Sequence, residues 1–226
     1  MIFAKIDFIN LLPFHIYLKK NIKSSQLKQI IEYNKSYPSH INKRFKKRNV
    51  HSAFISSIKS KNEKSLDLGI IAKNDVLSVL AIPGKYEKDY QSDTSNALAL
   101  ILNVQGKILI GDKALKYYHN NDTENVIDLA LKWKEKYGLP FVFARLCYNK
   151  NEYQLKKTVK NFNKRHIKIP QYILQQYAKR SGLTKNQILN YLTKIDYEIG
   201  TKEKKALKLF FKLSKEKGII WQYLIR

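Results

Sequence analysis

Apolar residues in the first two thirds of the chain form short runs separated by polar turns. Residues 3–9 (FAKIDFI) alternate as a half-buried strand does, whereas 139–146 (LPFVFARL) is almost continuously apolar, as a strand covered on both faces is. These patterns predict strands at residues 3–9, 50–57, 68–72, 76–84, 107–112 and 139–146.

Helices are predicted between and after these strands. The clearest spans about 123–137, where apolar residues recur at helical spacing before Gly138 ends it. We predict the other helices at 14–20, 26–33, within 36–49, from near Asn96, and at 152–165, 170–181, 184–194 and 202–217. Strands that alternate with helices up to residue 146, followed by helices only, predict an α/β fold with a mainly parallel sheet.

Two apolar runs suggest how the chain is divided. LSVLAIP (77–83) and LPFVFARL (139–146) are separated by about 55 residues, enough for a small βαβ-type lobe. We therefore predict a larger lobe formed by 1–83 and 145–226, and a smaller lobe, 84–144, inserted between two crossing strands. A ligand would bind in the cleft between the lobes.

The composition excludes several classes of protein. No stretch of 18 apolar residues is present, so we expect no membrane span, and the N-terminal run is interrupted by Asp7 and Pro13, unlike a signal peptide. A single cysteine, Cys147, rules out an internal disulfide, and the five histidines lack two-ligand spacing, which argues against a metal. We expect a soluble, cytoplasmic protein.

The net charge of +25 is typical of proteins that bind nucleic acid. The 43 Lys and Arg residues are nevertheless scattered, and RFKKR at 44–48 is the longest basic block. Scattered lysine is equally consistent with a biased codon usage, and a positive field would also attract a small polyanionic substrate.

The stretch SDTS (92–95) places three hydroxyl groups at the start of a predicted helix. One interpretation is a helix cap; the other is an anion site, in which Ser92, Thr94, Ser95 and the amides of 95–97 bind oxygen atoms. No Glu or Gln stands three residues after Thr94 or Ser95 to complete a capping box, which leaves donors available. Asp93 favours the cap, because its carboxylate would repel an anion.

Five separated stretches resemble the chorismate dehydratase family of the futalosine route of menaquinone biosynthesis. The last two are the most specific, and a looser match continues through YLTKIDYEIG (191–200). The five are IDFINLLPF (6–14), YPSHINKRF (37–45) with FISS (54–57), VLSVLAI (76–82) with SDTSNALALIL (92–102), ILIGDKAL (108–115) and DLALKWKEKYGLPFVFA (128–144).

This resemblance implies a two-lobed fold like the type II periplasmic binding proteins, with a mainly helical C-terminal segment on the first lobe. The implied enzyme is a lyase that converts chorismate, a dicarboxylate, to 3-[(1-carboxyvinyl)oxy]benzoate, with no metal or organic cofactor. Only VQG separates the ALALILN helix from KILIGD, whereas relatives have a longer insertion there, so the smaller lobe is expected to be trimmed.

The resemblance also indicates site residues. Asn10 is the implied catalytic residue, and it would hydrogen-bond the ring substituents. The implied substrate-binding residues are Ser56, Ser92, Thr94 and Ser95, with Ser39 and Ser78 as further candidates. As a hypothesis, a carboxylate of the substrate itself accepts the proton. For Asp112 we expect a helix cap rather than a general base.

A second interpretation rests on QYAKRSGLTKNQILNYL (176–192), where Gly182 falls at the turn position of a helix-turn-helix. Lys179, Arg180 and Lys185 would then face phosphate, as in a DNA-binding regulator with a small-anion sensor lobe. The alternative is a plain helical hairpin with a Thr184–Gln187 capping box. A non-catalytic small-anion binding protein and a homodimer formed through exposed tyrosines also remain open.

Overall fold

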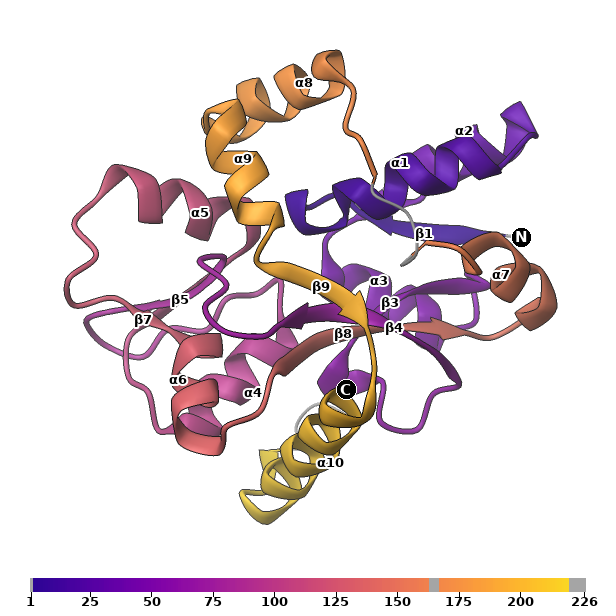
Figure 1. Ribbon diagram of the computed structural model, residues 1–226. Helices are drawn as coiled ribbons and strands as arrows, with labels where there is room; N and C mark the ends of the chain where they lie inside the picture. The colour runs from indigo at the N-terminus through magenta and orange to yellow at the C-terminus, as the bar shows by residue number, and fades with distance from the viewer. Residues whose placement is uncertain (1, 163–166, 220–226) are drawn as a thin grey trace.

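The computed structural model describes residues 2–162 and 167–219, which build two β-sheets (Figure 1). The larger sheet has the strand order β2-β1-β3-β8-β4-β9, and the smaller sheet has the order β6-β5-β7. The larger sheet consists of β1 (Phe3–Ile6), β2 (Lys35–Ser36), β3 (Ser52–Ser56), β4 (Ser65–Ala72), β8 (Phe141–Tyr148) and β9 (Ile195–Glu198), and the smaller sheet of β5 (Val79–Ile82), β6 (Lys107–Ile110) and β7 (Ile127–Asp128). The predicted class, a two-lobed α/β fold, is confirmed.

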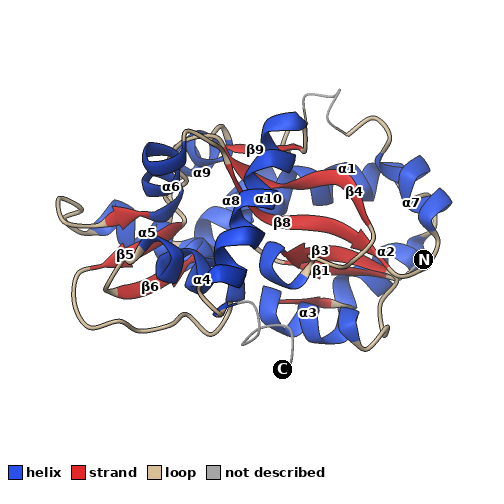
Figure 2. Cartoon of the chain, turned by 90° about the horizontal axis from the view of Figure 1, so that it is seen from below, coloured by secondary structure: helices blue, strands red, loops and turns tan. Residues whose placement is uncertain are grey.

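Helices cover both sheets. In Figure 1, α1 and α2 lie on one side of the larger sheet and α10 on the other, while α5 lies across the smaller sheet from α4 and α6. Figure 2 shows that the two sheets lie side by side. The helices are η1 (Ile9–Leu11), α1 (Leu12–Asn21), α2 (Ser25–Tyr33), α3 (Pro38–Lys46), η2 (Ser57–Lys59), α4 (Asp93–Leu102), α5 (Gly111–Asn120), α6 (Leu129–Tyr137), α7 (Glu152–Val159), α8 (Gln171–Ser181), α9 (Lys185–Leu192) and α10 (Thr201–Glu216).

The larger sheet is mixed, so the prediction of a mainly parallel sheet is wrong. Strand β1 pairs in parallel with β2 and β3, but β8 is antiparallel to both β3 and β4, and β9 is antiparallel to β4. The reason is that β8 returns from the smaller lobe and inserts between β3 and β4. An apolar run does not reveal the direction in which its strand enters a sheet.

The change from one sheet to the other occurs earlier than the predicted boundaries at 84 and 144. Strand β5, expected in the larger lobe, pairs instead with β6 and β7, and β8 begins pairing with β4 at Phe141. The connections at 73–78 and 138–140 therefore join the two sheets. Asp128 stabilises the first of these, because its Oδ2 accepts hydrogen bonds from the amides of Val76 (2.8 Å) and Leu77 (2.6 Å).

The C-terminal segment is helical except for β9, a strand that the sequence pattern did not predict. It lies between the two predicted helices 184–194 and 202–217 and forms the edge of the larger sheet by pairing with β4, a tertiary contact that a four-residue segment does not reveal by itself. Helix α7 ends at Val159, and the end of the predicted helix at 163–165 lies outside the described residues. The hairpin of α8 and α9 has Gly182 at φ 74° after α8 and the predicted Thr184–Gln187 capping box.

Aromatic packing fixes β9 against the N-terminal part of the chain. The ring of Phe14 on α1 lies 4.9 Å from that of Phe54 on β3 and 5.1 Å from that of Phe162, between centroids. Phe162 in turn lies 5.0 Å from Tyr197 of β9. Edge-to-face pairs of this kind contribute about 0.5–1.5 kcal/mol each beyond burial, so they hold Tyr197 firmly in place.

Candidate active site

A narrow cleft with a cavity volume of about 50 Å³ lies between the two sheets. Small-molecule sites occupy roughly 300–1,000 Å³, so a ligand of that size needs a more open arrangement of the two lobes. Strands of both sheets line it, together with the starts of α4 and α5. Among the described residues, no charged side chain lines the cleft. Its polar lining side chains are Asn10, Ser56, Ser78, Ser92 and Ser95.

All five of these belong to the set of residues implied by the resemblance. The other two members of that set do not line the cleft and have partners inside the protein. Thr94 Oγ1 accepts a hydrogen bond from the amide of Ile58 at 3.2 Å, and Ser39 Oγ donates to the carbonyl oxygen of Tyr90 at 2.9 Å. The structure therefore gives Thr94 and Ser39 supporting positions beside the cleft.

The start of α4 combines a cap with hydroxyl groups that face the cleft. The helix begins at Asp93, not near Asn96, and Ser92 is its cap: Ser92 Oγ accepts from the Ser95 amide at 3.2 Å. The amide of Asn96 donates to the carbonyl oxygen of Ser92 at 3.3 Å. The amides of Ser95 and Asn96 therefore have partners, as the helix-cap interpretation requires and the anion-site interpretation does not. The hydroxyls of Ser92 and Ser95, 2.9 Å apart, do line the cleft.

Helix α5 begins at the same cleft. Its first residue, Gly111, has φ 62°, and a Cβ there would lie 3.0 Å from the ring of Phe8, so only glycine fits without strain. The Gly111 amide donates to the carbonyl oxygen of Ser78 at 2.8 Å, and no side chain caps α5. The positive dipole ends of α4 and α5 thus both lie at the cleft, each worth about 0.3–1 kcal/mol to a bound negative charge.

Two cleft hydroxyls accept hydrogen bonds from donors behind them. Asn42 Nδ2 donates to Ser56 Oγ at 2.8 Å, and the Tyr191 hydroxyl donates to Ser78 Oγ at 2.9 Å. A serine hydroxyl has one proton of its own to donate. Since a protein donor already occupies a lone pair of each oxygen, the protons of Ser56 and Ser78 are available to a ligand. The cleft is therefore rich in donors.

Asn10 adds an acceptor. Its Oδ1 is buried and has no hydrogen-bond partner in the described part of the chain. Its carbonyl oxygen accepts from the Tyr197 hydroxyl at 2.6 Å, and the amide of the preceding residue, Ile9, donates to Asp112 Oδ1 at 3.1 Å. Leaving a buried acceptor unpaired costs about 1–3 kcal/mol, so a ligand that donates to Asn10 Oδ1 recovers that energy.

An ion-pair network beside the cleft joins the two lobes. Arg180 on α8 donates to Asp7 Oδ2 at 2.8 Å and to Asp112 Oδ2 at 2.9 Å. Burial raises the pKa of Asp112 above its ordinary value. For Asp7, the charges of Lys5 and Arg180 outweigh the effect of burial and lower the pKa. Asp112 does not cap α5 as we expected, because its carboxylate binds Ile9 and Arg180 instead.

A family model described as menaquinone biosynthesis matches residues 72–216 of this chain. A protein of Campylobacter jejuni subsp. jejuni (serotype O:23/36, strain 81-176), named chorismate dehydratase, is 51% identical over 219 residues, which are 95% of this chain and 98% of that protein. The chain belongs to the menaquinone-biosynthesis family. The resemblance seen in its sequence motifs is confirmed.

Solved structures share the fold of this menaquinone-biosynthesis protein. A protein from Archaeoglobus fulgidus superimposes with a TM-score of 0.65 at 12% identity, over 96% of this chain and 97% of that one. A Candida albicans protein, described as having the generic periplasmic binding protein fold, matches at 14% identity over 97% and 92% of the chains, with a TM-score of 0.41. The second similarity is too weak to support an argument; the first shows the fold alone.

The described residues of this family member contain neither a membrane-spanning helix nor a cluster of metal ligands. None of their helices combines the length and the apolar composition needed to cross a bilayer. No three His, Cys, Asp or Glu side chains in the same ranges lie close enough together to hold a metal ion.

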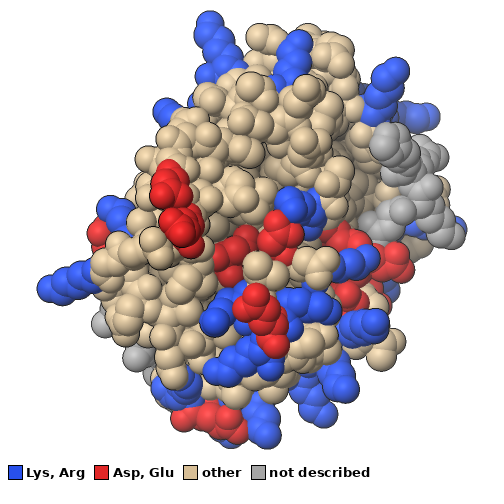
Figure 3. All heavy atoms as spheres, turned by 60° about the vertical axis from the view of Figure 1, so that its left-hand side comes forward, with Lys and Arg blue, Asp and Glu red and all other residues tan. Residues whose placement is uncertain are grey.

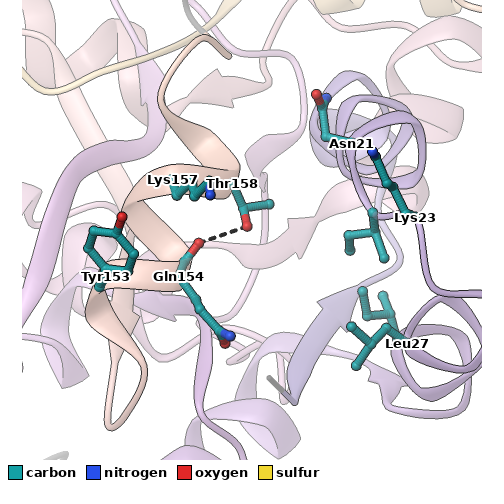
Figure 4. Close-up of a pocket in the computed structure, with 9 residues that line it drawn as sticks. Asn21, Lys23, Leu27, Tyr153, Gln154, Lys157 and Thr158 are labelled. Atoms are coloured by element: carbon teal, nitrogen blue, oxygen red, sulfur yellow. Dashed lines mark hydrogen bonds between the residues drawn. The ribbon is translucent and has the colours of Figure 1, made fainter.

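A second hollow of this menaquinone-biosynthesis protein, with a cavity volume of about 450 Å³, lies away from the cleft. Figure 4 shows Tyr153, Gln154 and Lys157 of α7 on one side of it and Lys23 and Leu27 near the start of α2 on the other. It contains none of the residues implied by the resemblance. The cleft between the sheets is therefore the candidate active site.

Proposed function

We propose that this protein removes water from chorismate to give 3-[(1-carboxyvinyl)oxy]benzoate, an early step of futalosine-dependent menaquinone biosynthesis. The similarity to the Campylobacter jejuni protein named chorismate dehydratase supports this reaction. The structural observation that carries the proposal is the match between the cleft and its ligand: several hydroxyl donors at two helix starts, and one unpaired buried acceptor, Asn10 Oδ1.

Chorismate has the complementary set of groups. At neutral pH it carries two carboxylates and a single hydroxyl on the ring, so that hydroxyl is its only O–H donor. Asn10 Oδ1 accepts this hydrogen bond and orients the ring. The hydroxyls of Ser56 and Ser78, and one hydroxyl of the hydrogen-bonded pair Ser92 and Ser95, donate to the oxygen-rich remainder of the substrate, and the ends of α4 and α5 stabilise its negative charge.

The reaction removes one ring proton and the ring hydroxyl, and the ring becomes aromatic. No His, Asp, Glu or Lys among the described residues lines the cleft, so the substrate's own carboxylate takes the ring proton. A hydroxyl of the cleft donates a hydrogen bond to the departing oxygen. The substrate's carboxyl group then passes the ring proton to that oxygen, which leaves as water, and the carboxylate is restored. Catalysis then rests on orientation and on fixed donors aimed at the developing charge.

The test is to incubate the purified protein with chorismate and follow the enolpyruvyl-benzoate product by chromatography. Asn10→Ala is expected to lower kcat/KM by at least about 10-fold, the effect of losing one hydrogen bond that a charged or reacting group needs. Asn121→Ala is the matched control, because Asn121 is exposed at the C-terminal end of α5 and does not line the cleft. Turnover of Asn10→Ala within a factor of two of wild type would remove Asn10 from the mechanism.

The rival DNA-binding role is tested in the same preparation by titrating duplex DNA at about 0.15 M salt, where non-specific binding by basic proteins is weak. Arg180, expected to face phosphate, instead contacts Asp7 and Asp112. On the face drawn in Figure 3, Asp and Glu gather across the middle and Lys and Arg are spread around them. These observations favour the plain hairpin.

The cytoplasmic location and the homodimer are further parts of the proposal. Fractionation of cells that express the tagged protein checks the location. Light scattering of the purified protein measures the oligomeric state.

A further inference from the structure

Tyr191 on α9 lies directly behind the candidate active site, although it does not line the cleft. Only 2% of its surface is exposed. Its hydroxyl donates to Ser78 Oγ at 2.9 Å, and its partner Ser78 does line the cleft. The two residues are 113 positions apart in the sequence, so this contact exists only in the folded protein.

The phenol of Tyr191 keeps its proton and donates it in a hydrogen bond. Burial raises its pKa well above the ordinary value, against the hydrogen bonds of Ser78 and Asn10, which lower it. The phenol therefore stays protonated at neutral pH, and a buried phenolic proton requires an acceptor. Ser78 Oγ is that acceptor.

This hydrogen bond determines what the Ser78 hydroxyl can donate to. Its oxygen accepts a hydrogen bond from Tyr191, which does not line the cleft, so its own proton remains available for donation into the cleft. The Asn10 side chain also interacts with Tyr191, and Asn10 Oδ1 has no partner among the described residues. One buried phenol thus lies behind both a donor and an acceptor of the cleft.

We propose that Tyr191 is a positioning residue of the dehydration: by donating to Ser78 Oγ, its hydroxyl directs the Ser78 proton onto the bound substrate. This inference rests on the proposed function and adds to it a residue that never touches chorismate. It assigns Ser78 as a donor to a substrate oxygen. The same arrangement recurs on the other wall, where Asn42 donates to Ser56 Oγ.

The test is a double-mutant cycle of Tyr191→Phe and Ser78→Ala, read as kcat/KM for chorismate. Ser78→Ala is expected to lower kcat/KM by about 10- to 100-fold, the range for a hydrogen bond to a charged group. Tyr191→Phe is expected to lower it by about 10-fold, and the double variant to be no slower than Ser78→Ala alone. If the fold-loss of the double variant equals the product of the two single fold-losses, the proposal is overturned, because a merely structural role of Tyr191 acts independently of Ser78.

Tyr17→Phe is the matched control, since Tyr17 is also buried, at 3% exposure, but does not line the cleft. Its effect should multiply with that of Ser78→Ala. Should Tyr191→Phe not fold, 3-fluorotyrosine at position 191 replaces it. This more acidic phenol is expected to change kcat/KM in the wild-type background and not in Ser78→Ala, and an equal change in both would contradict the proposal.

Failure of the proposed function gives a different result. If the wild-type protein does not turn over chorismate, the same cycle is measured as the Kd for chorismate by calorimetry. Coupling between Tyr191 and Ser78 in binding would then support the positioning role without the reaction. Independent losses in binding, or a wild-type protein that does not bind chorismate, would overturn it.

Discussion

Arg180 provides the sharpest test of how the two lobes are held together. Its guanidinium contacts Asp7 at the end of β1 and Asp112 at the start of α5, with side-chain exposures of 40%, 25% and 21%. A hydrogen bond to a charged group contributes about 1.5–3 kcal/mol when buried, but exposed pairs contribute only about 0.2–1 kcal/mol. At this intermediate exposure, Arg180→Ala is expected to cost about 1–2 kcal/mol in total.

The expected fall in melting temperature follows from the size of the chain. For a protein of 226 residues, 1 kcal/mol corresponds to about 2–4 °C, so Tm should fall by about 2–8 °C at pH 7. Differential scanning calorimetry measures this. Lys204→Ala is the control, because Lys204 pairs with Asp67 at 2.9 Å but both are largely exposed, 57% and 68%.

The loss of stability in Arg180→Ala should also depend on pH. The lowered pKa of Asp7 adds stability above its unfolded-state pKa, and that stability is lost as pH falls through the lowered value. The raised pKa of Asp112 has the opposite sign and costs stability as pH rises. Removing Arg180 reduces the stability gained from Asp7 and increases the stability lost at Asp112. The loss of stability in Arg180→Ala is therefore largest at pH 7 and shrinks toward pH 3. A deficit equal to that of Lys204→Ala, or constant over this range, would refute the reasoning.

Three further predictions concern single side chains. Asn42→Ala should lower kcat/KM by about 10-fold and stability by about 1–3 kcal/mol, because Ser56 loses both hydrogen bonds to Asn42; kinetics and urea unfolding measure these. Gly106→Ala should cost more than about 1 kcal/mol in urea unfolding, since its φ is 127° and a Cβ would lie 2.2 Å from the Ile82 carbonyl oxygen. Burial raises the pKa of Cys147 to about 12, so mass spectrometry should find it unmodified by iodoacetamide at pH 7.5 until urea unfolds the protein.

Local features of the site could be predicted from the sequence. The hydroxyl-rich start of α4 and the end of α8 at Gly182 depend on neighbouring residues, and the structure contains both. For SDTS (92–95), the helix cap and the cleft-facing hydroxyls are both present. Ser92 caps the helix, as its local pattern allows, while its hydroxyl and that of Ser95 also line the cleft.

Features set by distant contacts could not be predicted in this way. Strand β9 forms because the edge of β4 offers partners, and β5 joins the smaller sheet because β6 and β7 lie beside it. Tyr191 and Arg180 were missed as contributors to the site for the same reason. From the sequence, a tyrosine on the apolar face of an amphipathic helix is interpreted as a core residue. Only the fold shows that the Tyr191 hydroxyl contacts Ser78.

The contact between Tyr197 and Asn10 has a consequence for synthesis of the protein. These residues are 187 positions apart, and Asn10 leaves the ribosome long before Tyr197 is made. The smaller sheet can be complete while β9, the edge strand of the larger sheet, is still missing. A nascent or prematurely terminated chain that ends before β9 therefore has the serine residues of the cleft but lacks the hydrogen bond from Tyr197 to Asn10, so the cleft is complete only near the end of translation.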